Sequence, residues 1–490
     1  MSKPNKEFAI STLTRTLRPH LTRTKTIATV GPASNTLETL KNLILEGVDV
    51  FRLNMAHGTR EDHQAAVEKI RQACMETGVA AGILVDLAGP KIRLGQLHSE
   101  PTKLVGGTEV SFVRGTESSR DDELTCSYEP LLDELKVGDQ VMIRDGLVRL
   151  SVLSCEKDRV VCQVQDGGTI RSRQGVNLPG VNLGIPALLE KDLENAKWAA
   201  SNDIEFVSLS FVRNADEVAN LKQILRDHQS HAMVIAKIEK REAMDNLDSI
   251  VREADAIMVA RGDLGVEIEI EKTPVAQKKI IKTCGRNGKP VIVATQMLES
   301  MHRNARPTRA EASDVANAIL DGADACMLSG ETAIGEYPIE AVRMMQKIQG
   351  ETELSLKGRP SRMMSAEKLA EKGVTEAVMF GGALIARRMD AKLVVIATND
   401  GRAAIVKSKQ RDFIPTLAVT NNASVVNQMC LLWGVAPIHM PSLKLDVLRE
   451  WVDRWASEGT DFETGDRIVF MADTEVWPGV HDTVMVWSVP

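Results

Sequence analysis

The chain has 490 residues, of which 43% are hydrophobic and 26% are charged, with a formal net charge of -7. This length predicts roughly two to four domains of ordinary size, and the balance of hydrophobic and charged residues is typical of a globular protein. The acidic net charge argues against nucleic acid as a partner. A membrane partner is also not expected, because no run of residues is long and apolar enough to span a bilayer.

The seven cysteines are scattered, odd in number and never spaced as C-x-x-C. This pattern argues against a complete disulfide framework and indicates a reducing compartment. Residues 1–24 form a predicted N-terminal extension that lacks the hydrophobic region of a signal peptide. Its Arg, Ser and Thr content faintly resembles a transit peptide, but an ordered or frayed extension of a cytoplasmic protein is the simpler interpretation.

Short β-branched apolar runs alternate with helical patterns from residue 24 to about residue 351. Continuous apolar runs of this length are typical of strands buried on both faces of a parallel sheet. After the first run, Asn35 and Glu38 have capping-box spacing, and Gly47 can end the helix. Eight such units predict an α/β fold with a (β/α)8 TIM barrel over residues 25–90 and 187–351. The predicted strands are Thr26–Val30, Val48–Leu53, Gly82–Leu87, Ile204–Leu209, Met233–Ile238, Ala256–Val259, Val291–Ala294 and Ala325–Leu328.

Residues 91–186 interrupt this alternation, because they show no helical period. Short alternating runs separated by Gly and Asp turns predict an inserted all-β domain, a small β-barrel, on the face where barrels carry their active sites. This domain could act as a lid. Its predicted strands are Glu109–Val113, Gln140–Ile143, Leu147–Leu153 and Arg159–Val164.

The remaining residues, 352–490, are predicted to form a separate C-terminal α/β domain. A helix is expected at Thr375–Arg388 and a strand at Lys392–Thr398, and the alternation continues to a last strand at Val484–Val489.

The fifth predicted strand ends in Lys237 and Glu239, which face the same way because they are two residues apart. The next strand ends in a segment that contains Asp263, which we expect beside Glu239 on the same rim. Two carboxylates near an ammonium suit a hard divalent cation such as Mg²⁺ or Mn²⁺. A buried structural network of the same three charges explains this pattern about equally well when it is taken alone.

Polar residues at other strand ends favour an active site over a purely structural network. Arg52 and Asn54 end the second strand, and Arg93 follows the third. Arginine presents a planar fork that suits phosphate and carboxylate oxygens. Arg52, Arg93 and Lys237 around two carboxylates therefore predict a site for an anion together with a metal. Further polar strand ends are Asp86, Thr295 and Ser329.

The chain also contains a series of specific motifs in a fixed order, which are Lys25–Ile27, Gly31–Ser34, Arg52–Asn54, His57–Thr59, Asn177–Gly180, Lys237–Glu239, Met258–Gly265, Ala294–Met301 and Arg306–Glu311. In these motifs the chain resembles the pyruvate kinase family over nearly its whole length. The resemblance implies the barrel, the inserted β domain and the C-terminal α/β domain that the periodicity predicts.

Members of this family transfer the phosphoryl group of phosphoenolpyruvate to ADP, and the enolate that remains is protonated to pyruvate. The resemblance implies that Glu239 and Asp263 hold the divalent metal and that Lys237 lies beside the transferring phosphoryl group. Arg52 would bind the phosphoryl oxygens, and Thr295 would lie near the carbon that is protonated. Further implied substrate contacts are the backbone N–H groups around Gly262 and Asp263 and the side chain of Ser329; the implied nucleotide contacts are Pro32, His57, Arg93 and Lys191.

A second divalent ion would accompany the nucleotide, and the resemblance also implies a homotetramer. Many members need K⁺, held by Asn and Ser of the second strand and by Asp and a carbonyl after the third. Asn54 and Asp86 are present here, but Ala56 stands at the Ser position and Lys91 at a position that is usually Glu. Leu87 also departs from the usual residue. Because a lysine ammonium can supply the charge of a monovalent cation, we predict that K⁺ is dispensable, although a surface lysine on the lid hinge is the alternative.

Effector-regulated members bind a sugar phosphate with the loop after the first strand of the C-terminal domain. That loop is Thr398–Ala404 here, and Asp400 within it would repel a phosphate. We therefore predict that fructose 1,6-bisphosphate is not a strong activator. Two other functions stay open: a metal-dependent lyase or aldolase that stabilises pyruvate enolate, and a catalytically silent binding protein.

Overall fold

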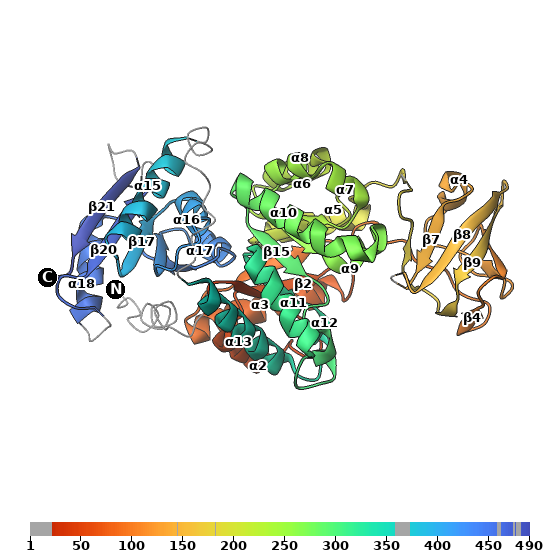
Figure 1. Cartoon of the computed structure of the whole chain (residues 1–490), viewed down its shortest axis with the longest axis horizontal. Helices are drawn as coiled ribbons and strands as arrows, with labels where there is room; N and C mark the ends of the chain where they lie inside the picture. Colours follow the sequence, from red (N-terminus) through yellow and green to blue (C-terminus); the bar gives the residue numbers. More distant parts are fainter. Residues whose placement is uncertain are drawn as a thin grey trace.

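The computed structural model describes residues 22–144, 146–181, 183–357, 373–457, 462–473, 476 and 482–490. The predicted N-terminal extension therefore lies outside the described residues, apart from residues 22–24. Three bodies lie in a row along the long axis of the molecule, with the barrel between the C-terminal domain and the inserted domain (Figure 1).

Eight parallel strands form the closed barrel that the alternating pattern predicts. Each strand pairs with the two adjacent strands of the barrel, in the order β1-β16-β15-β14-β13-β12-β3-β2. Most of their residues are buried, as expected for strands covered on both faces. The strands are β1 (Lys25–Thr29), β2 (Val50–Asn54), β3 (Gly82–Asp86), β12 (Phe206–Leu209), β13 (Met233–Ile238), β14 (Ala256–Ala260), β15 (Val291–Ala294) and β16 (Ala325–Leu328).

Helix α2 (Leu37–Glu46) shows where the prediction of helix ends was right and where it was wrong. It ends at Gly47, which has φ 119° as a left-handed C-cap requires. It begins at Thr36, whose hydroxyl accepts the backbone N–H of Thr39, so the predicted capping box of Asn35 and Glu38 is wrong by one residue. The other barrel helices are α3 (Arg60–Thr77), α5 (Glu190–Ser201), α6 (Ala215–Asp227), α7 (Arg241–Asp245), α8 (Leu247–Glu253), α9 (Arg261–Glu267), α10 (Thr273–Asn287), α11 (Arg309–Asp321), α12 (Gly330–Ala333) and α13 (Pro338–Leu356), with short 3₁₀ turns at Ile270–Lys272 and Glu299–His302.

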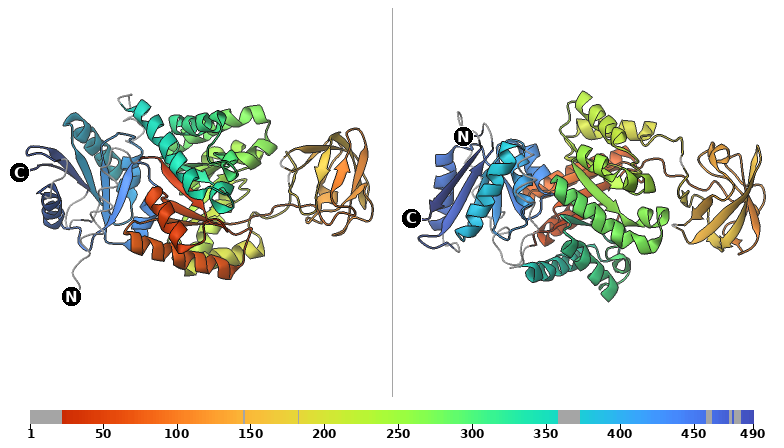
Figure 2. Two further views of the ribbon diagram at one scale, coloured as in Figure 1. Left: turned by 90° about the horizontal axis from the view of Figure 1, so that it is seen from below. Right: turned by 45° about the horizontal axis from the view of Figure 1, so that its top comes forward.

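The inserted domain leaves the barrel after β3 and returns before α5, so two chain segments connect it to the barrel (Figure 2). It contains a six-stranded sheet in the order β11-β7-β8-β9-β5-β6 and a two-stranded sheet of β10 and β4 around its own hydrophobic core. Its elements are β4 (Thr102–Leu104), β5 (Glu109–Val113), β6 (Glu123–Leu124), α4 (Leu131–Glu134), β7 (Gln140–Ile143), β8 (Val148–Cys155), β9 (Arg159–Asp166), β10 (Gly168–Ile170) and β11 (Val176–Asn177).

The C-terminal domain has a five-stranded sheet in the order β19-β18-β17-β20-β21, of which only the last strand is antiparallel to its neighbour. It therefore forms an α/β domain of its own, as predicted. Its elements are α15 (Val374–Arg388), β17 (Leu393–Ala397), α16 (Arg402–Ser408), β18 (Thr416–Thr420), α17 (Ala423–Met429), β19 (Val435–His439), α18 (Leu445–Ser457), β20 (Arg467–Ala472) and β21 (Thr483–Ser488).

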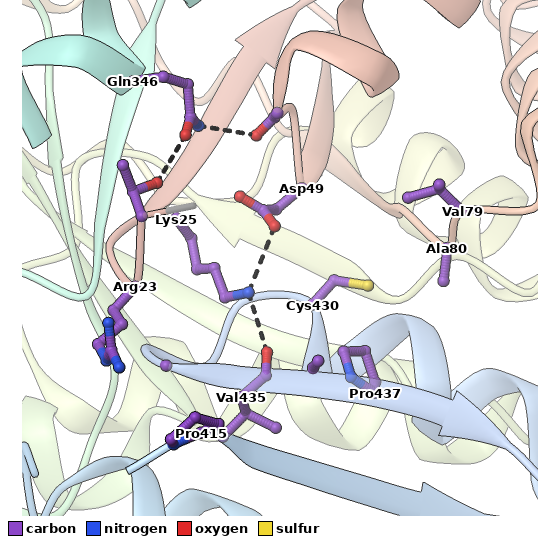
Figure 3. A pocket seen from close by; sticks show the side chains of 14 residues that line it. Arg23, Lys25, Asp49, Val79, Ala80, Gln346, Pro415, Cys430, Val435 and Pro437 are labelled. Carbon is purple, nitrogen blue, oxygen red and sulfur yellow. Dashed lines mark hydrogen bonds and ion pairs between the residues drawn. The ribbon is translucent and has the colours of Figure 1, made fainter. Parts of the chain in front are cut away.

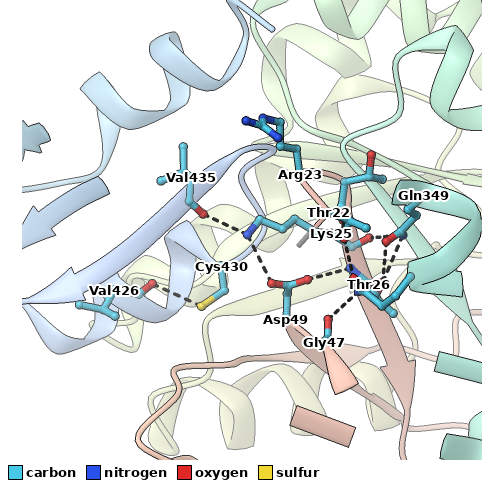
Figure 4. Close-up of polar contacts among 12 residues, drawn as sticks. Thr22, Arg23, Lys25, Thr26, Gly47, Asp49, Gln349, Val426, Cys430 and Val435 are labelled. Carbon is cyan, nitrogen blue, oxygen red and sulfur yellow. Dashed lines mark hydrogen bonds and ion pairs between the residues drawn. The ribbon is translucent and has the colours of Figure 1, made fainter. Parts of the chain in front are cut away.

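The C-terminal domain contacts the barrel at the amino ends of the barrel strands. Lys25, the first residue of β1, places its Nζ 3.3 Å from Asp49 Oδ1 and 3.0 Å from the Val435 carbonyl oxygen, beside a pocket that Gln346 and Pro437 also line (Figures 3 and 4). Asp324, which directly precedes β16, pairs with Lys409 at 2.5 Å and with Arg411 at 2.9 Å. The C-terminal domain thus covers this end of the barrel, whereas the opposite end, from which the inserted domain departs, is not covered by it and is called the open end below.

No described helix has both the length and the apolar character needed to cross a membrane.

Candidate active site

Lys237 and Glu239 meet at the tip of β13, as their spacing predicts. Lys237 Nζ lies 3.0 Å from Glu239 Oε1, and the two side chains are 12% and 1% exposed. The other carboxylate oxygen of Glu239 accepts the backbone N–H of Phe211 at 2.7 Å. Both side chains are therefore held in place before any ligand binds.

Asp86 is the second carboxylate against Lys237, and this contact was not predicted. Its Oδ1 lies 3.3 Å from Lys237 Nζ, and its Oδ2 lies 2.6 Å from a terminal nitrogen of Arg52. Burial opposes ionisation of this carboxyl, but the charges of Lys237 and Arg52 outweigh burial and lower the pKa of Asp86 to about 2. Asp86 is consequently ionised at neutral pH and fixes the two cations that flank it.

Two serines that were not predicted as site residues complete this cluster. The Ser208 hydroxyl donates to Asp86 Oδ1 at 2.6 Å, and the Ser210 hydroxyl accepts from Lys237 Nζ at 2.7 Å while it donates to the Leu87 carbonyl. Burial alone would lower the pKa of Lys237, but Asp86 and Glu239 raise it instead, so the ammonium stays charged. Both are polar residues near a strand end, Ser208 within β12 and Ser210 directly after it, which is the same sequence signal that predicted the other site residues.

Asp263 lies in the first turn of α9, on the same rim as Glu239. Burial first and the charge of Asp263 second raise the pKa of Glu239, and the Lys237 ammonium opposes both. Lys91 Nζ is 3.8 Å from Asp263 Oδ1. Among the described residues, no group of three or more His, Cys, Asp or Glu side chains could hold a metal.

Thr295 and Gly262 are adjacent at the ends of β15 and β14. The Thr295 hydroxyl accepts the Gly262 N–H at 2.8 Å and donates to the Ala294 carbonyl at 2.7 Å. Ser329, at the end of β16, donates its backbone N–H to Glu331 at 2.7 Å, and its buried hydroxyl has no hydrogen-bond partner among the described residues. All three predicted residues thus lie at the carboxyl ends of neighbouring strands.

The predicted nucleotide residues are more dispersed. His57 and Lys191 both adjoin His63, since the His57 carbonyl lies 2.9 Å from a His63 ring nitrogen, and the Lys191 charge helps to lower the pKa of His63, after burial. Pro32 is exposed in the turn that follows β1. Arg93 belongs to the inserted domain, where its guanidinium donates to the Arg173 carbonyl at 3.2 Å.

The oxygens of the predicted monovalent-cation region already accept hydrogen bonds from other groups of the protein. Asp86 accepts from Arg52 and Ser208, the Leu87 carbonyl accepts from Ser210, and Asn54 Oδ1 accepts the Ala56 N–H at 3.2 Å.

The loop Thr398–Ala404 of the C-terminal domain is also bonded internally. The Thr398 hydroxyl donates to Asp473 at 2.5 Å and accepts the Gly401 N–H at 2.9 Å.

Comparison with known proteins agrees with this geometry. The sequence models described as "Pyruvate kinase, barrel domain" and "Pyruvate kinase, alpha/beta domain" match residues 21–342 and 376–487. A pyruvate kinase of Mycobacterium intracellulare is 42% identical over 452 residues, which are 92% of this chain and 94% of that protein, and one of Geobacillus stearothermophilus is 39% identical over 93% of this chain and 78% of its own length. The crystal structure of a pyruvate kinase from Cryptosporidium parvum superposes with a TM-score of 0.86 at 35% identity, covering 96% of this chain and 97% of that one. The chain therefore belongs to the pyruvate kinase family.

Proposed function

We propose that this chain transfers the phosphoryl group of phosphoenolpyruvate to ADP, giving pyruvate and ATP. The observation that carries the proposal is the buried Lys237 ammonium, held between Asp86 and Glu239 and beside Arg52 at the open end of the barrel. A charged lysine that is fixed in this way stabilises negative charge as it develops on a phosphoryl group and an enolate oxygen, without reorganisation during the reaction.

Glu239 and Asp263 are proposed to hold a divalent metal, Mg²⁺ or Mn²⁺. Their oxygens are the hard ligands that these ions prefer, and their mutual repulsion, which raises the pKa of Glu239, would be relieved by a shared cation. When bound, the metal would act as a Lewis acid toward the substrate's carboxylate and enolate oxygens. A site with only two protein carboxylates suits Mg²⁺, which usually keeps water and substrate oxygens among its ligands.

The other side chains then have complementary roles. Arg52 would bind the phosphoryl oxygens with the part of its guanidinium that Asp86 does not use. The Gly262 N–H already donates to the Thr295 hydroxyl, so of the two predicted N–H groups that of Asp263 would receive the substrate carboxylate, with the Ser329 hydroxyl nearby. Thr295 would serve the protonation of the enolate carbon, directly or through a water molecule. Pro32, His57, Arg93 and Lys191 would contact the nucleotide and its own divalent ion, with Arg93 arriving on the inserted domain as a lid.

The test is a coupled assay of pyruvate formation with Mg²⁺, phosphoenolpyruvate and ADP. We expect pyruvate and ATP in equal amounts. Pyruvate enolate chemistry that proceeds at the same rate without ADP would instead indicate the lyase or aldolase function. An inactive protein that binds phosphoenolpyruvate would indicate a binding protein.

We further propose that K⁺ is not required. Two features support this: the oxygens of Asp86 and Leu87 already accept protein donors, and Lys91 brings a positive charge to within 3.8 Å of Asp263. The wild-type protein should be active in tetramethylammonium buffer, with less than a twofold gain on adding KCl. Lys91→Glu should create a K⁺ requirement. An inactive wild-type protein that KCl rescues would refute the proposal.

Three family expectations remain part of the proposal. We expect a homotetramer and a cytoplasmic location, and we expect fructose 1,6-bisphosphate to leave the half-saturating concentration of phosphoenolpyruvate within about twofold. Asp400 lies in the effector loop, and the Thr398 hydroxyl there is already bonded to Asp473.

A further inference from the structure

The residues that follow β15 have a backbone conformation that needs support. Thr295 has φ 66° and Gln296 has φ 53°, so two consecutive residues with side chains lie in the left-handed region. Each such residue is strained, and the strain persists only where the surroundings determine the conformation. The first of the two, Thr295, carries the hydroxyl that the proposed mechanism places near the enolate carbon.

Arg261 supplies that support from the neighbouring strand. One terminal nitrogen donates to the Thr295 carbonyl at 2.7 Å and to the Gln296 carbonyl at 3.1 Å. The other terminal nitrogen lies 2.5 Å from Asp314 Oδ2, and the arginine side chain is only 9% exposed. The planar fork thus joins both strained peptide groups to a carboxylate on α11.

The backbone of Arg261 completes the link. Arg261 is the first residue of α9, and the next residue, Gly262, donates its N–H to the Thr295 hydroxyl at 2.8 Å. A Cβ on Gly262 would lie 3.4 Å from that hydroxyl oxygen, an ordinary van der Waals contact, so the two chain segments are close neighbours. Thr295 is therefore held at two points, its carbonyl by the Arg261 guanidinium and its hydroxyl by the Gly262 N–H.

We propose that Arg261 is a positioning residue for the proton-transfer step, acting through the left-handed pair Thr295–Gln296. The inference rests on the proposed function, because it takes the role of Thr295 from there. In this step the Thr295 hydroxyl, or a water molecule bound to it, gives up a proton, and its oxygen keeps the electron pair of the broken O–H bond. The electron pair of the enolate C=C bond forms the new C–H bond with that proton, and a lone pair of the enolate oxygen forms the carbonyl double bond. In the reverse direction the methyl group loses a proton, and the electron pair of that C–H bond forms the enolate.

The experiment follows proton transfer separately from binding. Deuterium exchange into the methyl group of pyruvate is measured by NMR in D₂O with Mg²⁺ and inorganic phosphate, and the Kd of phosphoenolpyruvate is measured by calorimetry without ADP. Arg261→Lys keeps the positive charge but loses the two-sided hydrogen bonding of the guanidinium. It should lower the rate of exchange by about 10²-fold, which is the effect of displacing a catalytic group, here the Thr295 hydroxyl, by about 1 Å. The Kd of phosphoenolpyruvate should change less than threefold.

Arg343→Lys is the matched control, because Arg343 pairs with Glu46 on the outer wall of the barrel. It should exchange at the wild-type rate. If Arg261→Lys exchanges like the wild type, or loses exchange and binding in parallel, the proposal is overturned. Should Arg261→Lys not fold, Asp314→Ala replaces it, because Asp314 is 42% exposed. A several-fold loss of exchange is expected of it, and wild-type exchange would count against the proposal.

Thr295→Ala distinguishes a failure of the role proposed for Thr295 from a failure of the role proposed for Arg261. If this variant exchanges normally, the role proposed for Thr295 is wrong. If it loses exchange and Arg261→Lys does not, only the inference on Arg261 fails.

Discussion

Replacing Lys237 with Met tests directly whether the Lys237 ammonium stabilises the negative charge that develops during phosphoryl transfer. The side chain of Met has a similar length but no charge, so the variant would leave Asp86 and Glu239 facing an apolar group. The ammonium lies 3.3 Å and 3.0 Å from these two carboxylates. Arg52 would still neutralise Asp86, because it contacts the same carboxylate at 2.6 Å. We therefore expect the fold to survive and the chemistry to fail.

The size of the fall in kcat follows from the charge that is removed. Two unit charges about 3 Å apart interact with about 5 kcal/mol at an effective dielectric constant of about 20. Single cations that stabilise phosphoryl transfer contribute about 10³–10⁵ in kcat, which corresponds to about 4–7 kcal/mol at 1.36 kcal/mol per decade. Both lines of reasoning give a fall in kcat of at least about 10³-fold for Lys237→Met.

The assay is coupled pyruvate formation at saturating substrates, beside a thermal unfolding scan. Lys240→Met is the matched control, since Lys240 is 13% exposed, pairs with the buried Glu267 at 2.6 Å and lies three positions further along the chain. It should lower stability by a similar amount and keep kcat within a few fold. A Lys237→Met rate within tenfold of the wild type, or an equal loss in both variants, would refute the reasoning.

Three further predictions concern stability. Burial, above all, raises the pKa of Asp473 to about 6. The contribution of the protonated carboxyl to the free energy of unfolding is therefore complete below about pH 4 and is lost as the pH rises through 6. Asp473→Asn should raise the unfolding temperature at pH 8 and not at pH 4, and equal shifts at both pH values would contradict this. Glu311 accepts the backbone N–H groups of Ser300 and Thr308, both at 2.7 Å, so Glu311→Ala should cost about 1–3 kcal/mol, and an unchanged denaturation midpoint would speak against it. A Cβ on Gly31 would lie 2.5 Å from the Ala333 carbonyl oxygen. Gly31→Ala should therefore lower the free energy of unfolding by about 1–3 kcal/mol and raise the KM for ADP by moving Pro32. A wild-type free energy of unfolding and a wild-type KM would show that the turn tolerates the added methyl group.

The barrel strands could be predicted from the sequence because their signal is local. Each predicted run overlaps its strand, and Met233–Ile238, Val291–Ala294 and Ala325–Leu328 have the predicted bounds. A strand covered on both faces is apolar over most of its length, so the signal that predicts it lies within the run itself. The start of α2 was wrong because Asn35 and Thr36 can both cap a helix and their spacing to acidic or polar partners differs by one residue.

The predicted contact between Lys237 and Glu239 is confirmed, because the direction of both side chains depends on a single strand. Lys237 and Glu239 meet because they are two residues apart. The contacts of Asp86 with Lys237 and of Ser210 with the same ammonium could not be predicted, because they join β3, β12 and β13 only when the barrel closes. The same holds for Asp324 with Lys409, which depends on how the C-terminal domain docks.

The charges at the barrel mouth balance before any substrate arrives. Lys237, Arg52 and Lys91 supply three positive charges, and the carboxylates that they contact, Asp86, Glu239 and Asp263, supply three negative ones. A substrate with a phosphate and a carboxylate would leave this enclosed site strongly negative, and uncompensated charge of that kind is costly away from water. The cluster can therefore accept such an anion only together with added cations. For that reason the affinity for phosphoenolpyruvate should depend steeply on the concentration of the divalent metal. Even if Lys91 replaces K⁺, the site would still need the divalent cation to bind the substrate.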